Sequence, residues 1–208
     1  MKSANWWLHS CLVAALVCLL CGCGAMASTT ATQSNPTSTP LKRAPSPTSP
    51  TQPTSHPIIS DPVRLLVPKI GVDTLVEKVG IAPNGDMATP SAHPWTEVGW
   101  YALGVRPGER GNAVVAGHLN RPGGSPAVFW HLRDLQAGDP VTIKDRHGKT
   151  LHFRVTHLAS YPPQSAPLQE IFGESNRASL NLITCAGDWL PSEQQTALRL
   201  VVYTSLIR

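Results

Sequence analysis

The amino-acid sequence predicts an all-β protein whose strands close into a barrel. Short runs of β-branched and aromatic residues recur between clusters of turn residues, and about eight such runs occur in the C-terminal three quarters of the chain. Only one or two short segments have helical spacing. An eight-stranded barrel is the expected architecture, because closure removes the unpaired edges that a row of short strands would otherwise expose.

Composition divides the chain into three parts. Residues 1–27 are largely apolar, carry no formal charge apart from Lys2 and are expected to form a signal or membrane anchor, and residues 28–60 are mostly Ser, Thr and Pro. A stretch of the second kind cannot bury a core, so we expect a disordered linker. The remaining residues, 61–208, are numerous enough to fold as one domain.

The apolar N-terminal segment has three possible fates. It could be cleaved after Ala27, retained as a single span, or lipidated at Cys23 within a sequence that loosely resembles a lipobox. Retention suits a Pro-rich stalk. In each case we expect the positive N-terminus to stay inside and the domain to face the outside of the cell; as a single span or through lipid, the segment would hold the protein at the cell membrane.

The charge of the domain is nearly balanced. Of the 17 basic residues, Lys2, Lys42 and Arg43 precede Asp61, which leaves 14 against all 13 acidic ones. No basic stripe with interleaved aromatic residues is present, so nucleic acid is not an expected partner. No acidic cluster suited to calcium occurs either, and the sequence predicts no metal and no cofactor.

The first half of the domain contains four expected strands. They span residues 63–70, 74–79, 86–89 and 111–120, with an Asn-Gly turn at Asn84 before the third. Residues 90–110 are rich in Pro, Gly and aromatic side chains and are expected to be an irregular segment packed across a barrel end.

The second half contains an expected helix over 127–135, where Val128, Phe129, Leu132 and Leu135 have helical spacing. A hairpin follows over 140–144 and 150–158, and then a short helix over 167–172. The last two strands are expected over 180–185, ending at a cysteine, and over 196–204.

Cys185 is the most informative single residue. The other four cysteines lie within residues 11–23, so Cys185 has no intramolecular disulfide partner in the domain. A lone cysteine at a strand end is ordinarily a small buried hydrophobic residue. In an exported domain a solitary thiol is less expected, which makes a nucleophile an equal alternative. A histidine and a cation close to Cys185 would decide in favour of the nucleophile.

His118 and Arg199 are the candidate partners of that thiol. Each lies in or at the end of a short apolar strand, and neighbouring strands of a barrel are about 4.8 Å apart, so all three side chains could meet at one end. A histidinium or guanidinium favours the thiolate. His93 is a rival histidine, and Arg199 could instead point outward from the barrel.

Several motifs together resemble those of sortases. Leu182-Ile183-Thr184-Cys185 is similar to the family's Leu-x-Thr-Cys signature, Ala116-Gly117-His118 to its histidine motif, and Arg199-Leu200-Val201-Val202 to its arginine strand. The similarity extends to class F sortases of actinobacteria through four further segments, at 64–72, 98–101, 106–109 and 127–129.

This resemblance implies a sortase barrel and a cysteine transpeptidase that cleaves a Leu-Pro-x-Thr-Gly-type sorting signal between Thr and Gly. Cys185 would be the nucleophile, His118 the general acid and Arg199 the group that holds the oxyanion. Thr184, Leu182 and Asn120 would support the site or bind substrate. The implied partners are surface proteins with a C-terminal sorting signal and an amine acceptor from a cell-wall precursor, or water in its place.

The sequence also departs from the family pattern. Many class F relatives have the arginine at the position of Ala197, two residues earlier on the same strand face, and glycine is common where Ala186 stands. The end of the chain at Arg208 without a second apolar span argues against a pilin-polymerising class. Two other interpretations remain: a cell-wall L,D-transpeptidase, although its Ser-His-Gly-Cys-type segment is absent, and an anchored binding barrel without activity.

Overall fold

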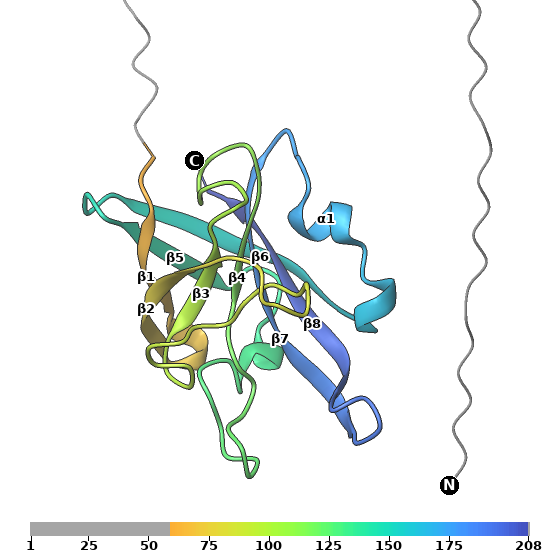
Figure 1. Ribbon diagram of the computed structural model, residues 1–208. Helices are drawn as coiled ribbons and strands as arrows, with labels where there is room; N and C mark the ends of the chain where they lie inside the picture. Colours follow the sequence, from red (N-terminus) through yellow and green to blue (C-terminus); the bar gives the residue numbers. More distant parts are fainter. Residues whose placement is uncertain (1–58, 208) are drawn as a thin grey trace, which may run out of the picture. The chain divides into compact units, whose positions relative to one another are not determined.

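The computed structural model describes residues 59–207, and within these residues eight strands form a closed barrel (Figure 1). The order around the barrel is β1-β2-β3-β4-β7-β8-β6-β5. The strands are β1 (Pro62–Val67), β2 (Val72–Val79), β3 (Val98–Tyr101), β4 (Gly111–Ala116), β5 (Pro140–Asp145), β6 (Thr150–Tyr161), β7 (Ala178–Leu190) and β8 (Gln195–Leu206). The prediction of an eight-stranded all-β barrel is confirmed.

The barrel interior is filled by one side chain in two from each strand. Leu65 and Val67 of β1, Phe153 and Val155 of β6 and Leu182 of β7 are buried and belong to one hydrophobic cluster. This alternation follows from the two-residue period of a strand. The apolar residues therefore fix which face of each strand points outward.

A second, smaller cluster lies on the outer face of β4, β7 and β8. Val114, Val201 and Tyr203 pack there with Ile171 of the short helix α1 (Leu168–Phe172), which lies in the connection between β6 and β7. Figure 1 shows this helix against the outside of the barrel. The helix expected over 167–172 is thus present, and it covers part of the sheet face that also carries Cys185.

The prediction of a helix over residues 127–135 is wrong. The segment forms turns, with a single 3₁₀ turn at Leu132–Asp134. The backbone N–H groups of Ala127, Val128 and Phe129 donate to the carbonyls of Leu119, Trp95 and His118, respectively, instead of joining a helix. Phe129, Leu132 and Leu135 are nevertheless buried in the core. These three side chains hold the connection between β4 and β5 against the core, and they do not form one face of a helix.

Two strand predictions in the first half also need correction. Residues 86–89 form no strand, and only an isolated bridge joins Ile81 to Met87. Within the segment expected to be irregular, Val98–Tyr101 forms β3, parallel to β2 and antiparallel to β4. Only four residues belong to β3, so its identity as a strand depends on its neighbours more than on its own pattern.

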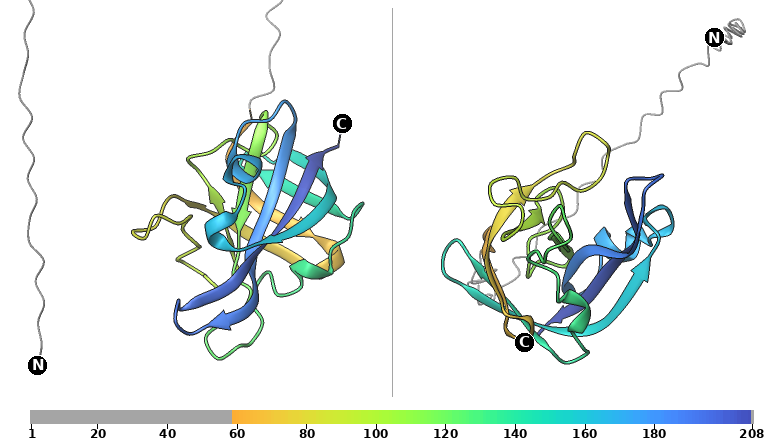
Figure 2. Two further views of the ribbon diagram at one scale, coloured as in Figure 1. Left: turned by 90° about the vertical axis from the view of Figure 1, so that its right-hand side faces the viewer. Right: turned by 90° about the horizontal axis from the view of Figure 1, so that it is seen from below.

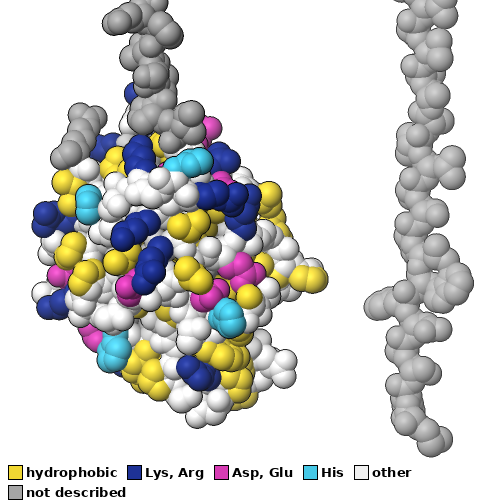
Figure 3. Space-filling view, turned by 90° about the vertical axis from the view of Figure 1, so that its left-hand side faces the viewer, with side chains coloured by type: hydrophobic (Ala, Val, Ile, Leu, Met, Phe, Trp, Pro, Cys, Tyr) yellow, Lys and Arg dark blue, Asp and Glu magenta, His cyan; other side chains and the backbone are white. Residues whose placement is uncertain are grey.

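Asp61, the residue before β1, forms ion pairs with three basic side chains. It lies 3.1 Å from Lys78 Nζ, 3.0 Å from Arg106 Nε and 3.7 Å from Arg146 Nη2. The hydrogen bond from Lys78, with that from Arg106, lowers the pKa of the Asp61 carboxyl despite some desolvation. Figure 3 shows basic and acidic side chains mixed over the face of the barrel that carries β1, β2 and β5.

The expected signal or anchor at 1–27 and all but the last two residues of the linker at 28–60 lie outside the described residues. Between residues 59 and 207, no helix has the length and apolar character needed to cross a membrane.

Gly117 provides a test of the packing next to the expected site histidine. A Cβ on Gly117 would lie 2.7 Å from Phe129 Cδ2 and 2.8 Å from Val128 Cγ1, closer than such atoms approach. We expect Gly117→Ala to lower the free energy of unfolding by about 1–3 kcal/mol, as overpacking does. Urea unfolding followed by circular dichroism would measure this.

The matched control is Gly80→Ala, because a Cβ on Gly80 meets nothing within 4 Å and its φ is not positive. This variant should be neutral or slightly more stable than the parent. Equal destabilisation by the two substitutions would contradict the packing described for Gly117.

Candidate active site

Cys185, His118 and Arg199 line one cavity of about 1320 Å³. The connection after β4 and the far ends of β7 and β8 form its walls. The left view of Figure 2 shows the β7–β8 hairpin extending from the barrel next to this connection. Residues from three separate parts of the chain thus meet in one place.

Cys185 and Arg199 are direct cross-strand partners. The register of β7 and β8 pairs Cys185 with Arg199 and Ile183 with Val201. Side chains of paired residues lie on the same face of a sheet, with Cβ atoms about 4.5–5.5 Å apart. The thiol, which forms no disulfide, and the guanidinium therefore project together from the outer face, and both residues are partly exposed.

The prediction that the strand ends at Cys185 is wrong. β7 continues to Leu190, and the register with β8 shifts between Ala186 and Trp189. Gly187 has a φ of 73° at this irregularity, a conformation that glycine adopts without steric cost. Extra residues in one strand bend it locally and redirect its side chains, and such bulges are frequent next to active sites. Cys185 lies just before this bend.

Arg199 is held by groups at the beginning of its own strand. Its Nη1 donates to Thr196 O at 3.1 Å, to Thr196 Oγ1 at 3.0 Å and to Leu198 O at 3.1 Å, and its Nη2 donates to Gln195 Oε1 at 3.0 Å. These contacts hold the guanidinium on the cavity side of β8. The side chain is thus not a freely moving surface arginine.

His118 lies two residues after the end of β4, and its ring packs against Trp95. The ring centroids are 4.9 Å apart with an interplanar angle of 47°. Burial lowers the pKa of the His118 imidazole below its ordinary value, because desolvation disfavours the charged form. At neutral pH the ring is therefore mainly neutral and able to accept a proton.

Thr184 connects the strand of the thiol to that of the histidine. It is buried, and its hydroxyl donates to the carbonyl of Gly117 at 2.8 Å. The Gly117 N–H in turn donates to the carbonyl of Ile183 at 3.1 Å. The residue before His118 is thereby fixed to the two residues before Cys185.

The remaining residues singled out from the sequence lie in different places. Asn120 lines the cavity and forms a bridge with Pro126, which closes the loop after His118. Leu182 is fully buried in the barrel core and supports β7 from inside without lining the cavity. His93, the rival histidine, is exposed and is not among the residues that line this cavity.

Sequence reasoning missed several residues of this site. Trp95 was noted only as part of an irregular apolar segment, and nothing in its context indicated the contact with His118. Gln195 and Thr196 appeared to be ordinary residues near a strand end. Trp130 and Trp189 also line the cavity, and Trp189 is largely exposed at 59%. An apolar side chain at the tip of a hairpin was the one signal that could have identified Trp189.

The arrangement combines a thiol, a neutral imidazole and a guanidinium. A thiol whose proton passes to a nearby base is an activated nucleophile, and a guanidinium next to it can stabilise negative charge on an oxygen. Within residues 59–207, no group of three or more His, Cys, Asp or Glu side chains is placed to hold a metal ion. The site is chemically suited to acyl transfer through a thioester.

Comparison with known proteins identifies the family. The model of the sortase domain family matches residues 65–207, which include every strand but the first three residues of β1. The comparison with curated proteins found no match.

Solved structures have the same fold. A lid mutant of sortase A from Corynebacterium diphtheriae is similar with a TM-score of 0.56 and 20% identity, over 73% of this chain and 72% of that one. Sortase C-1 from Actinomyces oris has a TM-score of 0.56 and 22% identity over 71% and 76%. Sortase A from Listeria monocytogenes has a TM-score of 0.52 and 21% identity over 70% and 86%. The family match over residues 65–207 and the closed barrel lead to one conclusion: the chain belongs to the sortase family, whose members are transpeptidases.

Proposed function

We propose that this protein is a cysteine transpeptidase that cleaves a Leu-Pro-x-Thr-Gly-type sorting signal between Thr and Gly and joins the new Thr carboxyl to an amine. The observation that carries this proposal is the cross-strand pair of Cys185 and Arg199 in a cavity that also contains His118. Surface proteins that carry the signal are the donor substrates. The acceptor is an amine of a cell-wall precursor, and water replaces it in hydrolysis.

The reaction begins with transfer of the thiol proton to His118. The lowered pKa of His118 means that the ring starts neutral and can take this proton. The Cys185 thiolate then attacks the Thr carbonyl carbon and forms a tetrahedral intermediate, whose oxyanion accepts hydrogen bonds from Arg199. When the C–N bond breaks, His118 returns the proton to the leaving amine of Gly, and a thioester remains.

The second half of the reaction reverses these roles. The acceptor amine attacks the thioester carbonyl and loses a proton to His118, and Cys185 leaves as a thiolate that recovers the proton. Arg199 must release part of its present hydrogen bonding to meet the oxyanion, and Gln195 is the most easily displaced partner because it contributes a single side-chain oxygen. Thr184 acts through its hydrogen bond to Gly117 and not through substrate.

Class and location belong to the same proposal. The cysteine, histidine and arginine motifs, together with the four further segments that resemble class F sortases, favour a class F enzyme. In this enzyme Arg199 would serve in place of an arginine at the position of Ala197. The apolar segment at 1–27 would anchor the protein in the cell membrane, as a single span or through lipid, with the catalytic domain outside.

The first test is cleavage of a fluorogenic Leu-Pro-x-Thr-Gly peptide by the full chain in detergent. We expect turnover that depends on Cys185, and the Cys185→Ala variant should be inactive because no other described residue in the cavity supplies a thiol. Mass spectrometry of the products would locate the cleaved bond. A folded protein that cleaves none of several such peptides would be a binding barrel and not the proposed enzyme.

The second prediction concerns the pKa of His118. We expect Trp95→Ala to raise this pKa towards the ordinary value of about 6.5, because removal of the indole admits water to the imidazole and makes its charged form less costly. NMR titration of the His118 ring protons would measure the shift, and the pH dependence of kcat/KM should move in the same direction.

Trp130→Ala is the matched control, since this tryptophan lines the same cavity but packs against Arg133 and not against His118. It should leave the pKa of His118 unchanged. An unchanged pKa in Trp95→Ala would show that the indole is not the source of the desolvation.

The third prediction concerns Arg199. Arg199→Ala should reduce turnover by about 10²–10³-fold with a smaller change in KM, because the oxyanion exists only in the transition state. Arg199→Lys should restore little, since an ammonium does not reproduce the planar fork. Steady-state kinetics with the same peptide would measure both variants.

Arg121 is an alternative cation, because it lines the cavity, whereas Arg106 is paired with Asp61 elsewhere and Arg133 stacks on Trp130. Arg121→Ala should retain most of the activity. If it loses more turnover than Arg199→Ala does, the oxyanion role belongs to the loop after β4 and not to β8.

A further inference from the structure

A second pocket, of about 380 Å³, lies on the same outer sheet face as Cys185 but at the opposite end of β7. Asn181, Ile183 and Cys185 share this face, because side chains two residues apart on a strand point the same way. Asn181 is four residues from Cys185, or roughly 13 Å along the strand. Buried apolar residues of the outer cluster, including Val201 and Ile171, lie between the two ends. The pocket is thus separate from the proposed active site.

Two asparagines from the neighbouring strands β4 and β7 line this pocket. Asn112 Nδ2 of β4 donates to the carbonyl of Glu170 at 2.9 Å, and Asn181 Nδ2 of β7 donates to the carbonyl of Ile171 at 2.8 Å. A carbonyl oxygen can only accept a hydrogen bond. The amide atom that contacts it must therefore be the nitrogen, which fixes the orientation of each asparagine amide. Both side chains therefore have their nitrogen bound to α1 and their Oδ1 available for another group.

Asn181 Oδ1 is the one buried side-chain polar atom without a hydrogen-bond partner among the described residues. The residue is 1% exposed. A buried polar atom without a partner costs about 1–3 kcal/mol, so native structures usually provide a protein group, a water or a ligand for it. A ligand that fills this place has to donate a hydrogen bond.

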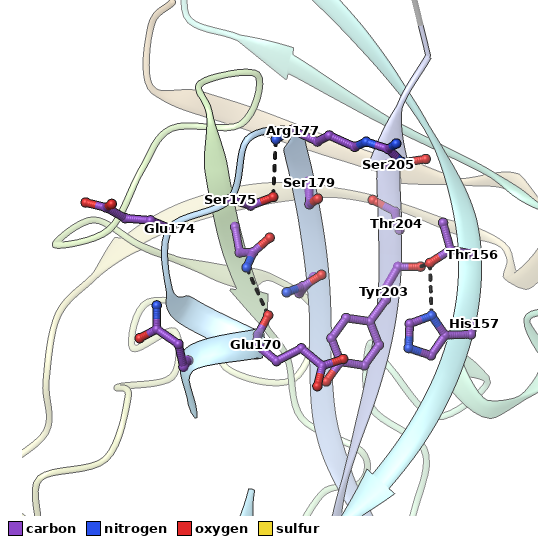
Figure 4. Close-up of a pocket in the computed structure, with 13 residues that line it drawn as sticks. Thr156, His157, Glu170, Glu174, Ser175, Arg177, Ser179, Tyr203, Thr204 and Ser205 are labelled. Carbon is purple, nitrogen blue, oxygen red and sulfur yellow. Dashed lines mark hydrogen bonds between the residues drawn. The ribbon is translucent and has the colours of Figure 1, made fainter. Parts of the chain in front are cut away.

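The rest of the pocket presents many neutral polar groups and charges of both signs. Figure 4 shows Glu170 and Glu174 on the α1 side and Arg177 near Ser205 at the other end. The side chains of Ser175, Ser179, Ser205 and Gln169 add further polar groups, whereas the hydroxyls of Thr156, Tyr203 and Thr204 already donate to Tyr203 O, the Tyr161 hydroxyl and Leu180 O, respectively. The pocket therefore offers both donors and acceptors.

One wall of the pocket is aromatic. The rings of His157 and Tyr203 are stacked with centroids 4.3 Å apart and an interplanar angle of 7°. The Tyr203 hydroxyl donates to the Tyr161 hydroxyl at 3.2 Å, and burial raises the pKa of Tyr203, so the ring stays neutral. Figure 4 shows the Glu170 carboxylate extending towards the Tyr203 ring.

We propose that this pocket binds a neutral polyol, namely a small saccharide, at a site independent of Cys185. Sugar hydroxyls both donate and accept, which matches planar amides, carboxylates and hydroxyls around an aromatic wall. An anion fits poorly, because two carboxylates oppose the single arginine. A peptide fits poorly as well, since the closed barrel leaves no strand edge here for backbone pairing. The pocket volume lies within the range of roughly 300–1,000 Å³ that is usual for small-molecule sites.

The test is an NMR titration of the full chain, labelled with ¹⁵N, in a detergent without sugar groups. The probes are maltose, cellobiose and di-N-acetylchitobiose, each added alone. We expect at least one to shift the side-chain amide signals of Asn112 and Asn181 in a saturable manner, while the backbone signal of Cys185 stays in place. Ethylamine serves as a cationic probe of the same carboxylates.

Two variants make the test specific. Glu170→Ala alters an exposed side chain and should weaken saccharide binding by about tenfold, the loss expected for a hydrogen bond to a charged acceptor. Glu97→Ala is the matched control, because Glu97 lines neither pocket, and it should bind as the parent does. Asn181→Leu should abolish binding but could disturb the fold, so the conclusion depends on the Glu170 variant.

Three results would overturn the proposal: no shift with any of the three saccharides, shifts with ethylamine alone, or equal weakening by the Glu97 and Glu170 variants. The peptide cleavage assay gives a separate answer. Saccharide binding by the inactive Cys185→Ala variant would support this site even if the proposed transpeptidase activity failed.

Discussion

The register of β7 between β4 and β8 sets the position of the thiol relative to the histidine and the arginine of the candidate active site. Ala116 is paired with Ile183 and Cys185 with Arg199, and the Thr184 hydroxyl binds the carbonyl of Gly117. A slip of one residue would turn Cys185 into the barrel and bring Thr184 to the surface, because side chains alternate between faces. Leu180 and Leu182 oppose such a slip, since both would leave the core. The hydrophobic core of the barrel thereby fixes the position of the thiol.

The same register accounts for the different character of the two ends of this sheet face. The end near Cys185 opens into a large cavity between a bulged hairpin and the loop that contains Asn120. The opposite end is covered by α1, whose backbone carbonyls accept hydrogen bonds from the side chains of Asn112 and Asn181. Apolar packing of Val201 and Ile171 separates the two. One continuous surface thus carries both the candidate active site and the proposed saccharide pocket.

Much of the fold could be predicted from the sequence, because β6 has a two-residue alternation over Leu151, Phe153 and Val155, and β8 is a long run of β-prone residues. The helix expected over 127–135 was wrong for a physical reason: its backbone donors are used by tertiary partners at Trp95, His118 and Leu119. β3 was missed because four residues give too little pattern. The extension of β7 past Cys185 was missed because Gly187 suggests a turn where the chain in fact makes a bulge.

The site residues show a similar division. Cys185, His118 and Arg199 were identifiable because each has reactive chemistry in an apolar strand context, and the structure brings them to one cavity. Trp95 and Gln195 could not be identified from the sequence. Trp95 belongs to the site because it packs against His118, and Gln195 because it accepts a hydrogen bond from Arg199, and both contacts arise only in the folded chain.

The hydrogen bonds of Arg199 also bear on the entropy of substrate binding. A free arginine side chain loses about 2 kcal/mol of rotamer entropy when it is fully immobilised. Here four contacts with Gln195, Thr196 and Leu198 already restrict the guanidinium before any peptide arrives. Most of this ordering cost is therefore met when the barrel folds. In the proposed reaction the peptide would exchange hydrogen-bond partners on an already ordered group, and its association would be opposed by less conformational entropy than with a mobile arginine.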